Sequence, residues 1–315
     1  MGKSLFEVFG VTSPVSDPTK IPVDAVCPIG THAEVQPDPA FVFAYQTLRR
    51  LLRAIKKTVP LWIWGPSGCG KTELVVQTAA RLNRPCHVIP FGEETSVREL
   101  MGCFRLEGGQ TKFVYGRLTS AIMTPGAVVV LDEFPQAPPG IAGQLNRFLE
   151  TKQLVIQETG EIVKAAADVV VIATANTAGG QDETGLYAGN HPQNAATRNR
   201  FTSGLRVAYP TPAEEVKILQ AKHPLADTVL GAPTPEKSFT GSVAQLAADI
   251  RDLVESGAVS HVFSIRTSLA FVESTLDFTD VREGFSSAYY DLLADSERPV
   301  VAEVFHRTFK VRLEG

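Results

Sequence analysis

One stretch of the sequence has residue types and spacing that suit the binding of a nucleoside triphosphate. Residues 65–72 read GPSGCGKT and fit the pattern G-x-x-x-x-G-K-S/T. Glycines let backbone N–H groups wrap around phosphates, and a following helix adds the positive end of its dipole. Lys71 offers a point charge to the β- and γ-phosphates, and the Thr72 hydroxyl is a ligand for Mg²⁺. We therefore expect ATP to be bound by Gly65, Pro66, Ser67, Gly68, Cys69, Gly70, Lys71, Thr72 and Glu73.

Two carboxylates at the end of an apolar run form a second candidate group. Residues 128–131 are three valines and a leucine, and Asp132 and Glu133 follow them directly. The acidic residue that closes such a strand holds Mg²⁺ through water, which we expect of Asp132. Glu133 is then placed to polarise the attacking water as a general base. A solvated strand end is the alternative interpretation, but the position of the pair downstream of the glycine-rich loop favours hydrolysis.

Three further polar residues depend on the fold for any role. Asn176 ends a later apolar run, where it can hydrogen-bond the γ-phosphate or the attacking water, although a turn-forming Asn is the alternative. An arginine of the stretch that holds Arg198 and Arg200 can complete a neighbouring subunit's site as an arginine finger. Arg266 begins a predicted helix and can reach the γ-phosphate, although a surface position is the alternative for every arginine. The candidate catalytic residues are thus Lys71, Glu133, Asn176, Arg200 and Arg266, and the candidate Mg²⁺ ligands are Thr72 and Asp132.

The elements that must position these residues alternate between apolar runs and helical patterns. Continuous apolar strands between helices favour a parallel sheet that is buried on both faces. Two segments centred on turns, residues 104–115 around Gly108-Gly109 and residues 153–164 around Thr159-Gly160, predict hairpins. The expected strands are residues 61–64, 87–91, 127–131, 169–174 and, more weakly, 205–209; the expected helices among them are residues 41–57 and 71–82.

The character of the chain changes twice along its length. Residues 1–40 are rich in proline and short polar residues after the start, which is typical of an extended arm. Residues 41–210 hold the strands and the glycine-rich loop, and form the predicted α/β core. Residues 211–315 contain no apolar run of comparable strength and predict a helical subdomain, with helices at residues 214–221, 242–256, 267–277 and 286–293.

Composition limits the other function classes. The 315 residues carry a net charge of −4, which gives no sign of a general nucleic-acid binder, although a local basic patch stays possible. The four cysteines form no CxxC pair and the six histidines are scattered, so we expect no zinc-type site. The chain starts without an apolar signal core and has no run of membrane-spanning length, so we expect a cytoplasmic protein.

The order of glycine-rich loop, Asp-Glu strand, Asn-tipped strand, arginine and helical lid resembles the AAA+ ATPases. The predicted hairpins place the resemblance in the MoxR and dynein-related branch: residues 103–117 match its helix-2 insert, and residues 152–165 match the hairpin before Asn176. Within that branch the sequence is most similar to the ATPase subunits of aerobic cobaltochelatase. The most specific likeness is ATANT at residues 173–177 followed by TGLY at residues 184–187.

The resemblance implies a three-layer P-loop NTPase fold with a C-terminal helical lid. It also implies roles for three residues: Asn176 as sensor 1, Arg200 as the finger that acts on the neighbouring subunit, and Arg266 as sensor 2. A homo-oligomeric ring of six follows, with ATP at the subunit interfaces. A protein with a von Willebrand A-type domain, or another chelatase-type protein, is the partner that the resemblance implies.

Three functions are consistent with these observations. The first is a chaperone-like ring ATPase that couples Mg–ATP hydrolysis to the remodelling of a partner. The second is a genuine cobaltochelatase subunit that powers metal insertion into a corrin-type ring, with the chelation carried out by a partner. The third is a low-turnover, nucleotide-gated scaffold or nucleic-acid-associated motor. The presence of Asp132, Glu133 and Arg200 argues against an inactive ATPase.

Overall fold

A computed structural model describes residues 3–11, 21–23, 30, 35–179, 195–234 and 237–313. Its contacts divide the chain into two units. The first comprises Met1–Asp38, Phe43–Gly65 and Lys71–Val207, and the second comprises Pro39–Val42, Pro66–Gly70 and Ala208–Gly315. The middle residues of the glycine-rich loop, Pro66–Gly70, are thus grouped with the second unit.

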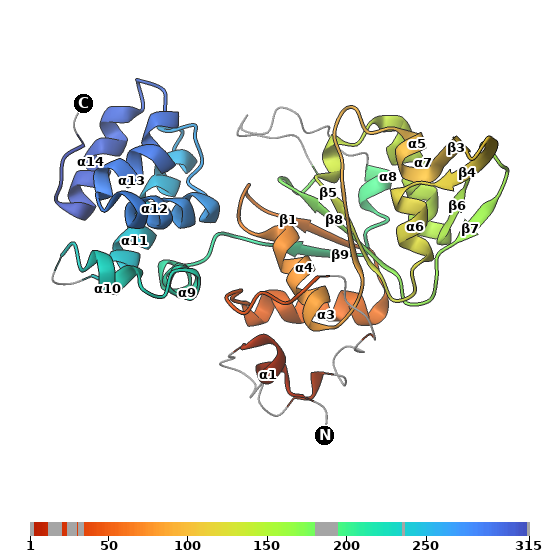
Figure 1. Ribbon diagram of the computed structural model, residues 1–315, viewed down its shortest axis with the longest axis horizontal. Helices are drawn as coiled ribbons and strands as arrows, with labels where there is room; N and C mark the ends of the chain where they lie inside the picture. The colour runs from red at the N-terminus through yellow and green to blue at the C-terminus, as the bar shows by residue number, and fades with distance from the viewer. Residues whose placement is uncertain are drawn as a thin grey trace. The chain divides into compact units, whose positions relative to one another are not determined.

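The first unit is built on a five-stranded parallel sheet (Figure 1). Its strands, in chain order, are β1 (Leu61–Trp64), β2 (Cys86–Pro90), β5 (Val128–Asp132), β8 (Val170–Ala175) and β9 (Ser203–Arg206). The spatial order is β2-β5-β8-β1-β9, so β1 lies between β8 and β9. Residues on β5 and β8 are almost entirely buried, as expected for a parallel sheet covered on both faces. The α/β fold predicted from the sequence is confirmed.

Helices cover both faces of this sheet. In Figure 1, α3 and α4 lie on one side, and α6 and α7 lie on the other. Buried residues of α6 and α7 form one core cluster with Val129 and Leu131 of β5 and with Val171 and Ala173 of β8. The alternate residues of these strands point to the opposite face because side chains alternate along a strand. The helices of this unit are α1 (Leu5–Phe9), α3 (Tyr45–Lys57), α4 (Lys71–Arg81), α5 (Val97–Met101), α6 (Arg117–Met123), α7 (Pro139–Thr151) and α8 (Ala195–Arg198), with a 3₁₀ turn at Phe134–Gln136.

Two antiparallel hairpins project from the core where the sequence predicts them. They are β3 (Gly102–Glu107) with β4 (Gln110–Tyr115), and β6 (Gln153–Val155) with β7 (Ile162–Lys164). Gly108 and Gly109 both have positive φ, which a two-residue hairpin turn requires. The Tyr115 hydroxyl donates to the Glu161 carboxylate at 2.9 Å, so the two hairpins contact each other. This bond to a carboxylate raises the pKa of the Tyr115 phenol.

Two sequence expectations in the first unit need correction. The last strand was expected at residues 205–209 but is β9 (Ser203–Arg206), because the backbones of Ser203 and Gly204 pair with Leu61 and Trp62. The N-terminal arm was expected to be extended, yet it contains helix α1. Ser4 and Glu7 form a capping box there, which satisfies the first N–H groups of the short helix.

The second unit is helical, and its described residues contain no extended strand. Its core is aromatic, with Phe263, Phe271, Phe285, Tyr289 and Phe305 all fully buried. The helices are α9 (Pro212–Lys222), α10 (Ala226–Leu230), α11 (Phe239–Glu255), α12 (Ile265–Phe278), α13 (Val281–Ala288) and α14 (Arg298–Phe309), with a 3₁₀ turn at Tyr290–Leu292.

The helix expected at residues 286–293 is wrong in its position. Helix α13 starts at Val281, where the Asp280 side chain accepts a hydrogen bond from the Arg282 N–H, and it ends at Ala288. Tyr289 has a non-helical backbone, with φ of −151°, and its ring is buried in the aromatic core. In the described part of the molecule, no helix is both long and apolar enough to cross a bilayer.

A buried ion pair joins three helices of the second unit. Arg251 of α11 donates to both carboxylate oxygens of Glu215 of α9, at 2.6 and 2.9 Å, and its Nε donates to the Phe263 carbonyl. Ser268 of α12 donates to the same carboxylate at 2.5 Å. The Glu215 side chain is completely buried, so removing either partner leaves an uncompensated charge in a low-dielectric core.

Replacing Glu215 by alanine should therefore lower the free energy of unfolding of this unit by roughly 3–5 kcal/mol. The matched control is Asp295→Ala, which breaks the Arg298–Asp295 pair at a position where the aspartate is 96% exposed. That control should cost at most about 0.5 kcal/mol. Urea unfolding followed by far-UV circular dichroism measures both changes, and equal losses for the two variants would contradict the assignment.

Candidate active site

The glycine-rich loop begins where β1 ends and stops where α4 begins. The Gly65 N–H donates to the Ala175 carbonyl at 3.3 Å, which fixes the start of the loop to the end of β8. Gly68 and Gly70 have φ of 68° and 88°, a left-handed conformation that side chains disfavour. Glycine is thus required at these positions by the backbone itself.

Lys71 is the first residue of α4 and is only 8% exposed. Its Nζ donates to the Gly65 carbonyl and to the Asn176 Oδ1, both at 2.9 Å. Asn176 directly follows β8, which is the neighbour of β1 in the sheet. The structure therefore brings together two residues that lie 105 positions apart in the sequence.

Asp132 at the end of β5 receives two hydroxyl hydrogen bonds on the same oxygen. Thr72 Oγ1 and Thr174 Oγ1 each donate to Asp132 Oδ1 at 2.5 Å. Thr72 comes from the first turn of α4, and Thr174 is a residue of β8 that is 1% exposed. A carboxylate and a hydroxyl from two elements thus meet at the same edge of the sheet as Lys71 and Asn176.

Glu133 follows Asp132 and has an unusual backbone conformation. Its φ of 52° lies in the left-handed region, which is uncommon for a residue with a Cβ and recurs at functional sites. Its N–H donates to Thr174 Oγ1 at 3.0 Å, and its exposed carboxylate accepts a hydrogen bond from Gln136 Nε2 at 2.8 Å. The left-handed turn directs Glu133 away from the line of β5 at the strand's carboxyl end.

Thr174 is a site residue to which the sequence reasoning gave no role. It lies in the ATANT stretch at residues 173–177, and its hydroxyl contacts both Asp132 and Glu133. The available signal was a hydroxyl in an otherwise apolar strand, because a buried hydroxyl needs a hydrogen-bond partner.

The other predicted residues are placed less centrally. Glu73 is exposed on α4, and its Oε1 accepts a hydrogen bond from Gln77 Nε2 at 2.9 Å. Cys69 is buried within the loop. Arg266 is exposed at the second position of α12, in the second unit. The TGLY stretch at residues 184–187, which the sequence resemblance uses, lies outside the described residues.

The two finger candidates differ in their surroundings. Arg200 is half-buried, its guanidinium forms an ion pair with Glu150 of α7 at 2.7 Å, and it also donates to the Ala196 carbonyl at 2.5 Å. Arg198 is exposed. A role of Arg200 toward another subunit requires it to exchange the Glu150 contact for a phosphate, so the choice between the two arginines stays open.

Comparison with known proteins agrees with this geometry. Residues 60–201 match the family model described as "AAA domain (dynein-related subfamily)". Residues 60–201 are therefore similar to AAA domains of the dynein-related subfamily. The matched segment includes β1, the glycine-rich loop, Asp132, Glu133, Asn176 and Arg200, so it contains all the predicted site residues except Arg266. The match supports the predicted activity, which is that of a nucleotide-binding ATP hydrolase.

Two named proteins match along most of the chain. The aerobic cobaltochelatase subunit CobS of Sinorhizobium sp is 28% identical over 317 residues, covering 99% of this chain and 91% of that protein. Protein NorQ of Paracoccus denitrificans is 28% identical over 249 residues, covering 73% of this chain and 85% of that protein. The resemblance to cobaltochelatase ATPase subunits and MoxR-like ATPases is confirmed.

A solved structure supports the fold. A RuvB mutant of Thermotoga maritima superposes with a TM-score of 0.50 at 14% identity, covering 86% of this chain and 78% of that one. An identity this low shows the fold alone.

The oxygen atoms around Asp132 fit Mg²⁺. The Asp132 carboxylate and the Thr72 hydroxyl are hard oxygen donors, which Mg²⁺ prefers. The two groups are hydrogen-bonded to each other. Among the described residues, no group of three or more His, Cys, Asp or Glu side chains forms a protein-only metal cage. Mg²⁺ that is bound with a nucleotide needs no such cage, because phosphates and water supply the remaining ligands.

Replacing Thr174 by valine keeps the shape of the side chain but removes the hydroxyl that contacts Asp132 and Glu133. We expect the ATP turnover rate at saturating ATP to fall about ten- to hundred-fold, because both acidic residues lose their orientation. Thr174→Ser keeps the hydroxyl and should restore most of the rate. A phosphate-release assay measures turnover, and wild-type turnover by the valine variant would show that Thr174 has no positioning role.

Proposed function

We propose that this chain is a ring-forming ATPase that couples Mg–ATP hydrolysis to the remodelling of a partner protein. The observation that carries the proposal is the convergence of Lys71, Asn176, Asp132, Thr72 and Glu133 on one edge of the sheet. Ligands of open α/β sheets bind beyond the carboxyl ends of the strands, where these residues lie.

In the proposed reaction, water attacks the γ-phosphorus in line with the bond to the leaving ADP oxygen. Glu133 accepts the proton of that water, and Asn176 orients either the water or the γ-phosphate. The Lys71 ammonium stabilises the charge that develops on the phosphate oxygens. Thr72 and Asp132 would hold Mg²⁺, which would supply further charge neutralisation at the phosphates when bound.

The ring proposal rests on the arginines. Arg198 is the last residue of α8 and Arg200 comes two residues later, and the Arg200 guanidinium contacts Glu150 and the Ala196 carbonyl of its own chain. In the proposal, one of them completes the site of a neighbouring copy, and Arg266 acts on the γ-phosphate as sensor 2. ATP would then be an assembly element of the ring as well as its fuel.

Two observations support a protein partner. The hairpins β3–β4 and β6–β7 expose large apolar side chains, with Phe104 at 52%, Leu106 at 76% and Ile162 at 56% exposure. The relative CobS is named as one subunit of a larger enzyme. We therefore propose that the partner is a protein, of the von Willebrand A-type or chelatase type, and that the ring acts on it mechanically.

A cobaltochelatase role is the second candidate, and the similarity to CobS over almost the whole chain favours it. In that case, the chain would supply ATP-driven work and a partner subunit would carry the tetrapyrrole and the metal. Metal insertion that depends on both this chain and ATP would support the candidate, and insertion by the partner alone would contradict it.

Replacing Glu133 by glutamine tests the proposed function directly. The isosteric amide cannot accept the water proton, so hydrolysis should fall by at least about 100-fold while ATP binding is retained. Light scattering with ATP should then show a stable assembly larger than one chain. Glu94→Gln, at an exposed carboxylate after β2, is the control and should hydrolyse normally. Near-normal turnover by Glu133→Gln would exclude Glu133 as the base, and a monomer with bound ATP would contradict the ring.

A further inference from the structure

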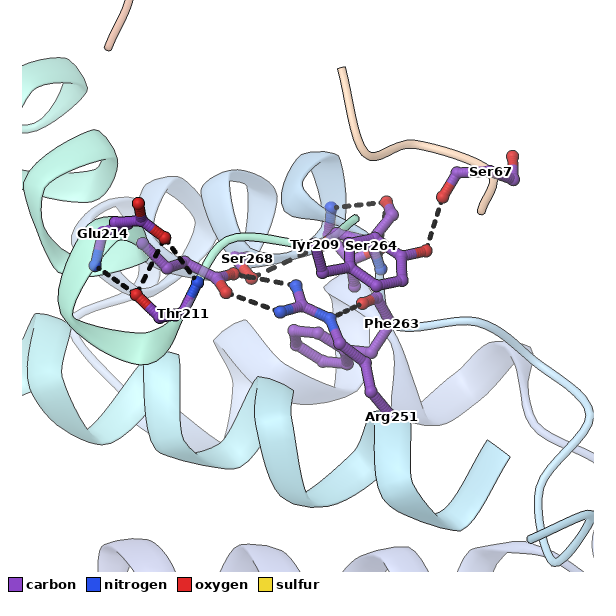
Figure 2. Close-up of polar contacts among 10 residues, drawn as sticks. Ser67, Tyr209, Thr211, Glu214, Arg251, Phe263, Ser264 and Ser268 are labelled. Carbon is purple, nitrogen blue, oxygen red and sulfur yellow. Dashed lines mark hydrogen bonds and ion pairs between the residues drawn. The ribbon is translucent and has the colours of Figure 1, made fainter. Parts of the chain in front are cut away.

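A tyrosine outside the predicted site contacts the glycine-rich loop. Tyr209 lies shortly after β9, and its hydroxyl donates a hydrogen bond to the backbone carbonyl of Ser67 (Figure 2). Both residues belong to the second unit, which includes loop residues Pro66–Gly70 as well as Ala208–Gly315. The AAA family model ends at residue 201, before this tyrosine.

The position of the Tyr209 ring is set by the buried ion pair. The Arg251 guanidinium lies over the ring, with its central carbon 4.2 Å from the ring centroid, at a distance where cation–π attraction is significant. Arg251 is itself held by the two Glu215 oxygens and by the Phe263 carbonyl. The Tyr209 ring therefore packs against a guanidinium group whose position is fixed.

The loop is also packed against the start of α12. A Cβ at Gly68 would lie 2.5 Å from the Cβ of Ser264, so only glycine fits there. Ser264 is the N-cap residue of α12, and its Oγ accepts a hydrogen bond from the Thr267 N–H. Figure 2 shows Tyr209 and Ser264 together near Ser67. Two side chains of the helical unit thus contact consecutive residues of the loop.

The hydrogen bond from Tyr209 to the Ser67 carbonyl also fixes the direction of the Gly68 N–H. A peptide unit is planar and trans, so its C=O and N–H point in opposite directions. Holding the Ser67 carbonyl on Tyr209 fixes the Gly68 N–H on the opposite side of the same peptide. Loops of this kind bind phosphate through backbone N–H groups, so the direction of each N–H matters.

We propose that Tyr209 is a positioning residue for ATP binding, which orients the Ser67–Gly68 peptide toward the phosphates and takes its own position from the Arg251–Glu215 pair. The inference rests on the proposed function in one respect, namely that residues 65–72 bind ATP. It adds a side chain that acts on the loop backbone to the residues that would bind ATP, in addition to any role of Arg266.

A purely structural role for Tyr209 would give a different experimental pattern. A hydroxyl that only stabilises the fold would change the melting temperature and leave the affinity for ATP unaltered. A hydroxyl that pre-orients the loop should change ground-state binding, and so KM, with little effect on kcat at saturation.

The chain offers a matched control for this comparison. The Tyr289 hydroxyl donates to the His261 backbone carbonyl at 2.5 Å, so it makes the same kind of bond within the core of the same unit. Tyr289 is fully buried, and its ring packs against Phe263 in the aromatic core. Tyr209→Phe and Tyr289→Phe each remove one hydroxyl and keep the ring.

The experiment measures binding of a fluorescent ATP analogue with Mg²⁺, steady-state ATP turnover and thermal unfolding for the 315-residue wild-type chain and both variants. We expect Tyr209→Phe to raise Kd and KM about three- to ten-fold, which is the scale of one lost hydrogen bond. Its kcat should stay within about two-fold of wild type. Tyr289→Phe should leave Kd and KM unchanged.

Two outcomes would overturn the inference while leaving the proposed function intact. In one, Tyr209→Phe binds and turns over ATP with wild-type Kd and KM. In the other, both phenylalanine variants weaken binding equally, in proportion to their loss of thermal stability. A wild-type chain that binds no ATP would instead remove the proposed function, and the inference would fall with it.

Discussion

The ammonium group of Lys71 connects the ends of two neighbouring strands. It donates to the carbonyl of Gly65, just after β1, and to the side chain of Asn176, just after β8. This geometry is possible only because β1 and β8 are adjacent and parallel, so that their carboxyl ends meet at one edge. The Gly65 N–H adds a backbone bond to Ala175, which fixes the start of the loop relative to the tip of β8.

Asp132 and Glu133 also depend on the order of the strands, because β5 pairs with the edge of β8 opposite to β1. Strand β5 pairs with β8, which places Asp132 and Glu133 within reach of the Thr174 hydroxyl. Each polar group at this edge therefore has a partner from a different element. Sites that are pre-organised in this way need little rearrangement when charge develops during a reaction. The geometry of the proposed site thus depends on the order of the strands in the sheet rather than on any single loop.

The sequence predicted the sheet well where apolar runs are bounded by strong breakers. Strand β1 occupies residues 61–64 as expected, because Pro60 and Gly65 bound four large apolar residues. Strand β9 was misplaced because half of it is Ser203 and Gly204, which pair through their backbones and carry no hydrophobic signal. Helix α13 was misplaced because the burial of Tyr289 ends it early.

The contacts that the sequence could not predict are those between distant residues. Arg251 and Glu215 are 36 positions apart, and Tyr209 and Ser67 are 142 positions apart. No local motif links the two members of either pair. The packing of α9, α11 and α12 buries Arg251 and Glu215 as an ion pair. The path of the chain after β9 brings Tyr209 to the loop. The motif residues could be predicted because they lie close together in the sequence. The residues that hold them in position come from distant parts of the chain.

The most direct test of the account is the effect of Lys71→Ala on ATP binding and phosphate release by the purified chain. Lys71 is the residue on which the loop, Asn176 and the proposed transition-state charge all depend. The account predicts that the variant stays folded, loses at least about 100-fold in phosphate release and binds ATP much more weakly. A folded Lys71→Ala chain that binds and hydrolyses ATP like the wild type would contradict the account.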